Sequence, residues 1–198
     1  MTFFWLDIRW IPLTTIEIRW HGRGGQGVVT ANELLAGAAL KEGKYIKAFP
    51  EFGPERMGAP IRAFTRLSDT PIQVHSQVYY PDMVVVIDPT LLKQTSIMEG
   101  LKEEGMLVAN FADGKDKLSK IVGKEKNVHA VNATAIAMEE IGRPTTNTAM
   151  LGAVVKVLNY VRLESVLEEL EAKFSGKFSK EVVAKNIKAV RRAYEEVD

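Results

Sequence analysis

The sequence predicts an α/β fold, in which a mostly parallel sheet carries helices on both faces. Segments with the alternation of strands are separated by segments of helical periodicity, which is the order expected of such a sheet. Residues 82–88 form a continuous apolar run, DMVVVID, typical of a parallel strand that is covered on both sides. No shift in composition divides the chain, so we expect a single domain of the doubly wound, Rossmann-like type.

The first predicted elements are a strand, a helix and a second strand. Apolar and polar residues alternate over residues 15–22, which end in a cluster of glycines. Apolar residues then recur at helical spacing over residues 28–42, and Gly43 ends this predicted helix. The second strand is predicted at residues 45–49, directly before Pro50.

The next segment begins with a loop. Residues 51–60 contain two prolines and two glycines, which prevent regular backbone hydrogen bonding. Two alternating segments follow, at residues 61–67 and 71–80, and a turn at residues 68–70 separates them. We expect these segments to be neighbouring strands, so that at least one strand pairing of the sheet is antiparallel.

The apolar strand at residues 82–88 is followed by a short helix, predicted near residues 91–100. Two more strands, at residues 106–110 and 127–133, complete the predicted sheet. The charged stretch between them, residues 114–126, is predicted to be a solvated helix or a loop. Four helices follow, at residues 134–141, 145–161, 163–174 and 179–196.

The composition excludes several classes of function. The 26 basic and 25 acidic residues leave a net charge of +1, so no general basic field would hold nucleic acid or an anionic membrane. Cysteine is absent, which excludes a disulfide, a thiol nucleophile and a thiolate-bound iron–sulfur cluster in this chain. The three histidines do not have the spacing of metal ligands, so we expect no metal site.

The N-terminal residues are apolar but do not form a membrane span. Asp7, Arg9 and Pro12 interrupt this segment, which has neither the basic start nor the cleavage site of a signal peptide. No apolar run of the chain reaches the roughly 18–20 residues that cross a bilayer. We therefore expect a cytoplasmic protein, with residues 1–14 as an extension to the domain of residues 15–198.

The strongest local signal for chemistry is HGRGGQG at residues 21–27. Gly22, Gly24 and Gly27 match the pattern G-x-G-x-x-G between a predicted strand and a predicted helix. Glycines let a ligand approach the backbone, and free amides at the start of a helix attract an anion. Arg23 could add a charge-assisted contact. The segment predicts a phosphate-binding turn, and the alternative is a tight turn that binds no ligand.

Two further segments are candidates for function. Glu55 and Arg56 lie in the predicted loop after the second strand, at the edge where open α/β sheets bind ligands; an exposed turn with solvated charges is the alternative. The segment TNTAMLGAV at residues 146–154 opens a predicted helix. Asn147 would be its N-cap and Gly152 would allow close helix packing, so this segment needs no ligand to explain it.

Four ordered segments resemble the gamma subunits of 2-oxoacid:ferredoxin oxidoreductases, most closely those of pyruvate enzymes. These segments are residues 21–27, 48–60, 82–92 and 146–153, and the likeness runs from about Thr15 to the C-terminus. The complete enzymes of this family decarboxylate a 2-oxoacid with thiamine diphosphate. They pass electrons through iron–sulfur clusters to ferredoxin and deliver the acyl group to coenzyme A.

The resemblance implies that this chain acts together with partner subunits. Alpha and beta subunits hold thiamine diphosphate, a delta subunit carries the clusters, and gamma-like domains are implicated in binding coenzyme A. The implied contacts to the phosphates of coenzyme A are Gly22, Arg23, Gly24, Gly25, Gln26 and Gly27. The residues implied to face the partner active site are Glu51, Glu55, Arg56 and Gly58. The absence of cysteine and of a thiamine diphosphate motif agrees with a chain that has no catalytic residue and no complete active site of its own.

Two alternatives stay open from the sequence. A self-sufficient Rossmann-type oxidoreductase would bind a dinucleotide at the same glycines, but it needs an acidic residue at the end of the second strand to hold the ribose. Glu51 is at about the right distance, although Pro50 precedes it in an irregular segment. A purely structural subunit would leave the turn empty.

Overall fold

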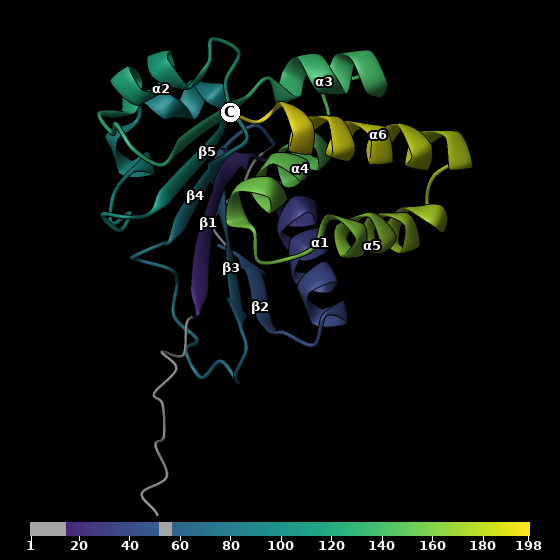
Figure 1. Cartoon of the computed structure of the whole chain (residues 1–198), viewed down its shortest axis with the longest axis horizontal. Helices are drawn as coiled ribbons and strands as arrows, with labels where there is room; N and C mark the ends of the chain where they lie inside the picture. Colours follow the sequence, from purple (N-terminus) through teal and green to yellow (C-terminus); the bar gives the residue numbers. More distant parts are fainter. Residues whose placement is uncertain (1–14, 52–56) are drawn as a thin grey trace, which may run out of the picture.

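A mixed sheet of six strands forms the centre of the structure, a computed structural model that describes residues 15–51 and 57–198. The strands lie across the sheet in the order β2-β3-β1-β4-β5-β6 (Figure 1). Their bounds are β1 (Ile16–Arg23), β2 (Tyr45–Pro50), β3 (Pro60–Ser68), β4 (Met83–Val86), β5 (Met106–Asn110) and β6 (Val128–Val131).

Helices cover both faces of this sheet (Figure 1). The α-helices are α1 (Val28–Lys41), α2 (Lys115–Val122), α3 (Ala133–Glu140), α4 (Asn147–Leu158), α5 (Leu163–Ser175) and α6 (Lys180–Glu196). Two short 3₁₀ helices, η1 (Pro89–Lys93) and η2 (Thr95–Ile97), connect β4 to β5. The α/β fold expected from the sequence is confirmed.

The sheet has a parallel half and an antiparallel half. β1, β4, β5 and β6 are parallel neighbours, whereas β3 runs antiparallel to both β1 and β2. The apolar run at residues 82–88 correctly predicts β4, which is buried along its whole length. The sheet contains antiparallel pairs, as expected, but they join β3, predicted at residues 61–67, to β1 and β2 rather than to residues 71–80.

The strand predicted at residues 71–80 is wrong. This segment connects β3 to β4 without strand structure. β3 lies between β1 and β2 and therefore offers no free edge to a further strand. The guanidinium of Arg66 instead donates to the carbonyl oxygens of Ser76 and Gln77, at 2.6 and 3.1 Å. The buried side chain of Arg66 thus donates the hydrogen bonds that a neighbouring strand would otherwise donate to this segment.

The single helix predicted near residues 91–100 is also wrong, since η1 and η2 stand in its place. The carboxylate of Asp88 accepts a hydrogen bond from the backbone N–H of Thr90 and so caps η1. Farther along, the guanidinium of Arg19 donates to the carbonyl oxygens of Ile97 and Glu99, at 3.0 and 2.6 Å. These contacts from distant parts of the chain hold the segment in short turns.

The two faces of the sheet bury cores of different size. The larger apolar cluster receives Val85 and Val108 from the sheet and packs them under α1, α3, α4, α5 and α6. The smaller cluster receives Val84 and Leu107 and packs them under η1, η2 and α2. Successive residues of β4 thus point to opposite faces, as the period of a strand requires. α4 is buried along most of its length. It packs closely against α6, because a Cβ on Gly152 would lie 2.1 Å from the carbonyl oxygen of Val190.

Across residues 15–51 and 57–198, we find no helix that combines the length and the apolar character needed to cross a lipid bilayer.

Candidate functional site

The glycine turn, residues 22–27, connects β1 directly to α1. Gly25 and Gly27 have φ angles of +92° and +76°, in the left-handed region that favours glycine. A Cβ on Gly22 would lie 2.4 Å from Cγ2 of Val28, so strand and helix are in contact at this point. The strand–turn–helix context expected from the sequence is therefore present, and the turn lies at the carboxyl end of the central strand.

Part of the expected partner-facing loop lies against this turn. The N–H of Gly24 donates to the carbonyl oxygen of Ala59 at 2.9 Å, and the N–H of Gly58 donates to the carbonyl oxygen of Gly24 at 3.1 Å. Met57, next to Gly58, is 94% exposed. Glu55 and Arg56, two other residues expected in this loop, lie outside the described residues.

Glu51 forms an ion pair within the protein and is not free to bind a ribose, the role that the dinucleotide alternative would give it. Its carboxylate forms an ion pair with Arg62 of β3, and Nη2 of Arg62 donates to it at 2.7 Å. Its backbone N–H also bonds the carbonyl oxygen of Arg62, at 2.9 Å. The carboxylate that a dinucleotide ribose would need is thus engaged within the sheet.

Asp88 is the centre of the polar network beneath the glycine turn. It is only 6% exposed, and its carboxylate accepts from Nε2 of Gln26 at 2.6 Å and from the hydroxyl of Thr90 at 2.6 Å. Nε of Arg23 lies 3.2 Å from the same carboxylate. Burial alone would raise the pKa of Asp88, but the hydrogen bonds from Thr90 and Gln26 and the charge of Arg23 outweigh it and lower that pKa.

This network uses the two polar side chains of the turn. Arg23 donates to the carbonyl oxygen of Gly58 at 3.1 Å and to the hydroxyl of Thr90 at 2.9 Å, in addition to its ion pair with Asp88. Gln26 accepts the backbone N–H of Arg23 at 2.8 Å. The place of Asp88 directly before Pro89 is the local sequence signal of its capping role.

Donors on the backbone of the turn remain available. Within the described residues, the N–H groups of Gly25, which is exposed, and Gly27, which is partly exposed, have no hydrogen-bond partner. They stand at the N-terminus of α1, where the partial positive charge of the helix adds to them. An anion at this turn would therefore be bound by the backbone more than by Arg23, whose charge Asp88 already balances.

His21 precedes the turn on β1 but is unsuited to acid–base chemistry. It is 5% exposed, and Nε of Arg19 donates to its Nε2 at 3.0 Å. Burial, together with the charges of Arg19 and Arg62, lowers the pKa of His21 to about 3. The imidazole is consequently neutral near pH 7 and serves as an acceptor for Arg19.

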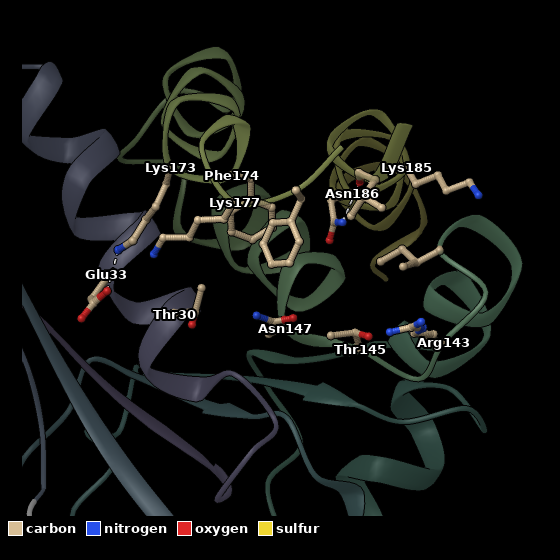
Figure 2. A pocket seen from close by; sticks show the side chains of 13 residues that line it. Thr30, Glu33, Arg143, Thr145, Asn147, Lys173, Phe174, Lys177, Lys185 and Asn186 are labelled. Atoms are coloured by element: carbon tan, nitrogen blue, oxygen red, sulfur yellow. Dashed lines mark hydrogen bonds and ion pairs between the residues drawn. The ribbon is translucent and has the colours of Figure 1, made fainter. Parts of the chain in front are cut away.

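A pocket lined by basic residues lies next to the glycine turn, beside Gly27. This basic pocket is a cavity of about 610 Å³ between α1, α4, α5 and α6, and Figure 2 shows it from close by. Its wall includes Arg143, Asn147, Lys173, Lys177, Phe178 and Lys185. A Cβ on Gly27 would lie 2.4 Å from Nδ2 of Asn147, so the glycine turn and the basic pocket share this wall.

Asn147 is not the N-cap that the sequence predicts. It is the first residue of α4, and Thr146 occupies the cap position without a side-chain capping bond. Asn147 is 5% exposed; its Nδ2 is 3.4 Å from the carbonyl oxygen of Gly27, and its Oδ1 has no hydrogen-bond partner. The close helix packing expected at Gly152 is confirmed by its approach to Val190.

Sequence reasoning missed the cations of the basic pocket. Arg143 precedes α4, Lys177 lies between α5 and α6, and Lys185 belongs to α6. Their spacing matches no motif, and only the packing of α5 and α6 beside α4 brings them together. The one available signal was the basic residues on both sides of the loop between the last two predicted helices.

Comparison with known proteins gives a consistent result. The model of the pyruvate ferredoxin/flavodoxin oxidoreductase family matches residues 17–196. The common subunit gamma of the pyruvate/ketoisovalerate oxidoreductases of Pyrococcus furiosus is 50% identical over 184 residues, which are 92% of this chain and 97% of that protein.

Solved structures agree with this match. The crystal structure of the pyruvate oxidoreductase subunit PORC from Thermotoga maritima has a TM-score of 0.83 at 46% identity, covering 93% of this chain and 97% of that one. The 2-oxoglutarate:ferredoxin oxidoreductase from Magnetococcus marinus was solved with 2-oxoglutarate, coenzyme A and succinyl-CoA bound. It has a TM-score of 0.73 at 22% identity and covers 91% of this chain but 30% of that one, which shows a shared fold alone.

Proposed function

The chain belongs to the pyruvate ferredoxin/flavodoxin oxidoreductase family, as the gamma subunit of a multi-subunit 2-oxoacid:ferredoxin oxidoreductase. From this premise we propose that its glycine turn holds the phosphates of coenzyme A during the oxidative decarboxylation of pyruvate. The contacts proposed are Gly22, Arg23, Gly24, Gly25, Gln26 and Gly27. The observation that supports them best is the pair of unpartnered N–H groups of Gly25 and Gly27 at the start of α1.

The side chains of the turn have a supporting role in this proposal. Asp88 fixes both Arg23 and Gln26, so the backbone donors are held in one arrangement before a ligand arrives. Such preorganisation reduces the entropy lost on binding. Arg23 is then a positioning residue as much as a contact, because removing it would leave the buried carboxylate of Asp88 without its cation.

The redox chemistry is proposed to belong to partner subunits. This chain contains no cysteine to hold an iron–sulfur cluster, so alpha, beta and delta subunits would supply thiamine diphosphate, the clusters and the contact with ferredoxin. Thiamine diphosphate would supply the decarboxylation chemistry there. The glycine turn would anchor the nucleotide end of coenzyme A, so that the thiol at its other end reaches the reaction centre as an oriented group.

The loop beside the turn is the proposed contact with those subunits. Gly58 is hydrogen bonded to the turn, and the neighbouring Met57 is almost fully exposed. Large exposed apolar side chains next to a binding site are typical of surfaces that become buried on assembly. Glu51, Glu55, Arg56 and Gly58 are the residues proposed to face the partner subunits.

The variant Gly25→Val tests the proposal in the assembled complex. The left-handed φ of Gly25 is unfavourable for valine, and the new side chain would stand beside the free N–H groups. We expect KM for coenzyme A to rise about tenfold or more. The rate of electron transfer from pyruvate that precedes transfer to coenzyme A should stay unchanged, because partner subunits perform it.

The matched control is Gly176→Ala. Gly176 has an ordinary φ of −84°, and an added Cβ would meet nothing within 4 Å. An intact Gly25→Val complex with unchanged KM for coenzyme A would assign the turn a structural role and overturn the proposal.

A further inference from the structure

We propose that the basic pocket binds a phosphorylated nucleoside, at a site distinct from the glycine turn. Arg143, Lys177 and the N-terminus of α4 would hold the phosphate, Asn147 would accept from the sugar or the base, and Phe178 would pack against the base. This proposal does not depend on the role of the glycine turn, since different donors make up the two sites.

The charge of the pocket favours an anion. Four of its lining residues are cationic, and Glu33 is the one carboxylate among them. Lys173 is bound to Glu33 at 2.5 Å, whereas Arg143 and Lys177 have no carboxylate partner within the described residues. Lys185 is bound to Glu181 at 2.6 Å on the surface of α6. Arg143 and Lys177 are therefore the cations that an incoming phosphate would neutralise.

The start of α4 adds a donor to the same wall. Within the described residues, the backbone N–H of Asn147, which lines the pocket, has no hydrogen-bond partner. Figure 2 shows Asn147 in the middle of the pocket, with Thr145 and Arg143 on one side of it and Lys177, beside Lys173 and Glu33, on the other. A phosphate near Asn147 would lie between the positive side chains of Arg143 and Lys177 and at the N-terminus of α4.

Asn147 supplies the observation that a bare phosphate does not explain. Its Oδ1 is buried, unpartnered and part of the pocket wall, and an amide oxygen can only accept. A deprotonated phosphate has no hydrogen to donate to it. A ribose hydroxyl or the amino group of a base does, so the ligand that completes this site carries a donor as well as a negative charge.

The apolar part of the pocket fits a planar ring. Phe174 and Phe178 contact each other edge to face, with centroids 5.2 Å apart, and both line the cavity. Phe178 is 49% exposed, so part of its ring remains open to a ligand. Stacking of a base on an aromatic side chain does not require a particular base. Phosphate, donor and ring together define a nucleoside phosphate, and the cavity of about 610 Å³ has the size of such sites.

Calorimetric titration of the full chain tests the proposal with four probes: adenosine 3′,5′-bisphosphate, ADP, adenosine and inorganic phosphate. We expect at least one of the two nucleotides to bind at least about tenfold more tightly than adenosine or phosphate alone. Tighter binding of the bisphosphate would identify the nucleotide end of coenzyme A as the occupant of the basic pocket, and would contradict its proposed place on the glycine turn. Tighter binding of ADP would identify a free nucleotide. Failure of both nucleotides to bind better than phosphate would overturn the proposal.

Variants locate the binding. Arg143→Gln combined with Lys177→Gln should weaken the nucleotide at least about tenfold, whereas Lys120→Gln on the exposed surface of α2 should not. Phe178→Leu should weaken the nucleotide and leave phosphate binding unchanged. Gly25→Val should leave the nucleotide affinity intact; loss of binding in Gly25→Val but not in the double variant would place the ligand on the glycine turn and contradict the inference.

Discussion

The glycine turn and the basic pocket share a wall at Gly27 and Asn147, but they use their polar groups in opposite ways. At the turn, Arg23, Gln26 and Asp88 bind one another, and the donors left over belong to the backbone. In the pocket, the side chains of Arg143 and Lys177 have no carboxylate partner within the described residues. The turn is therefore a rigid site with little net charge, whereas the pocket is a charged site whose side chains are free to rearrange.

The largest expected effect comes from disturbing the shared wall with Gly27→Ala. The φ of +76° strains any residue with a Cβ, and the added atom would collide with the amide of Asn147. We expect the free energy of unfolding to fall by about 2–4 kcal/mol. Both KM for coenzyme A and nucleotide affinity in the pocket should worsen. Denaturant unfolding and the two binding assays check this, with Gly176→Ala as the control.

An effect on only one of the two sites would show that Gly27 and Asn147 do not couple them. The distinction between the regions would then be complete, and each could be changed by itself.

A smaller effect is expected from Asp88→Asn, which leaves the glycine turn with a cation that no carboxylate balances, as in the basic pocket. Asparagine keeps the shape of the side chain but removes the charge that balances Arg23. We expect stability to fall by about 1–3 kcal/mol, because the buried network loses charge-assisted hydrogen bonds. KM for coenzyme A should fall, because an anion at the turn would then meet an unbalanced guanidinium. Thermal unfolding and steady-state kinetics of the complex measure the two changes.

The control for this variant is Asp113→Asn, which removes a carboxylate from an exposed ion pair with Lys117 and should change neither quantity. A stable Asp88→Asn complex with raised KM would mean that the loss of the preorganisation supplied by Asp88 outweighs the gain of an unbalanced guanidinium.

Acid should lower the stability of the protein through two buried groups near the glycine turn, His21 and Asp88. The lowered pKa of His21, about 3 against 6.5 in an unfolded chain, means that the unfolded state takes up a proton first as the pH falls. The contribution of His21 to the free energy of unfolding is thus fully present above pH 6.5 and decreases toward pH 3. Its slope is at most about 1.4 kcal/mol per pH unit. The lowered pKa of Asp88 acts in the same direction, because its contribution is lost as the pH falls through its folded-state pKa.

His21→Gln should flatten this dependence, since glutamine can still accept the hydrogen bond from Arg19. Unfolding midpoints between pH 4 and pH 7 would measure the slopes. An equal slope in the variant would contradict the assignment to His21.

The smallest effect is expected from salt. Raising the ionic strength to physiological values should weaken nucleotide binding in the basic pocket several-fold, by about 1 kcal/mol, because its cations are partly exposed to solvent. The salt dependence of KM for coenzyme A, measured in the Lys177→Gln complex so that the basic pocket contributes less, would show whether the glycine turn responds less to salt. Equal salt dependence of both sites would remove the contrast in charge drawn between them.

Most of the fold could be predicted from local patterns, because periodicity and punctuation residues determine strands and helices one segment at a time. β1, α1, β4 and α6 follow directly from such patterns. Residues 71–80 alternate like a strand but find no free edge beside β3, and this depends on sheet order rather than on their own sequence. Likewise, the helix predicted near residues 91–100 gives way to turns because Arg19, far away in the chain, binds its carbonyl groups.

The candidate sites differ in the same respect. The glycine turn is contiguous, so its conformation is encoded in six neighbouring residues and could be predicted. The basic pocket draws Thr30 from α1 and Lys185 from α6, which are brought together only when α4, α5 and α6 have packed on one face. Asn147 illustrates the limit: the sequence predicts a cap, whereas the packing of Gly27 against it makes it a wall residue.

The position of β1 in the sheet has a consequence for synthesis of the protein. β1 is made first among the described strands, yet its two neighbours, β3 and β4, are completed only at Ser68 and Val86. Until the nascent chain has emerged from the ribosome beyond that point, Ile18 and Trp20 lack the neighbouring strands and helices that bury them. Co-translational folding of this subunit must therefore wait for non-local pairing, and early strand edges are exposed to aggregation during that interval.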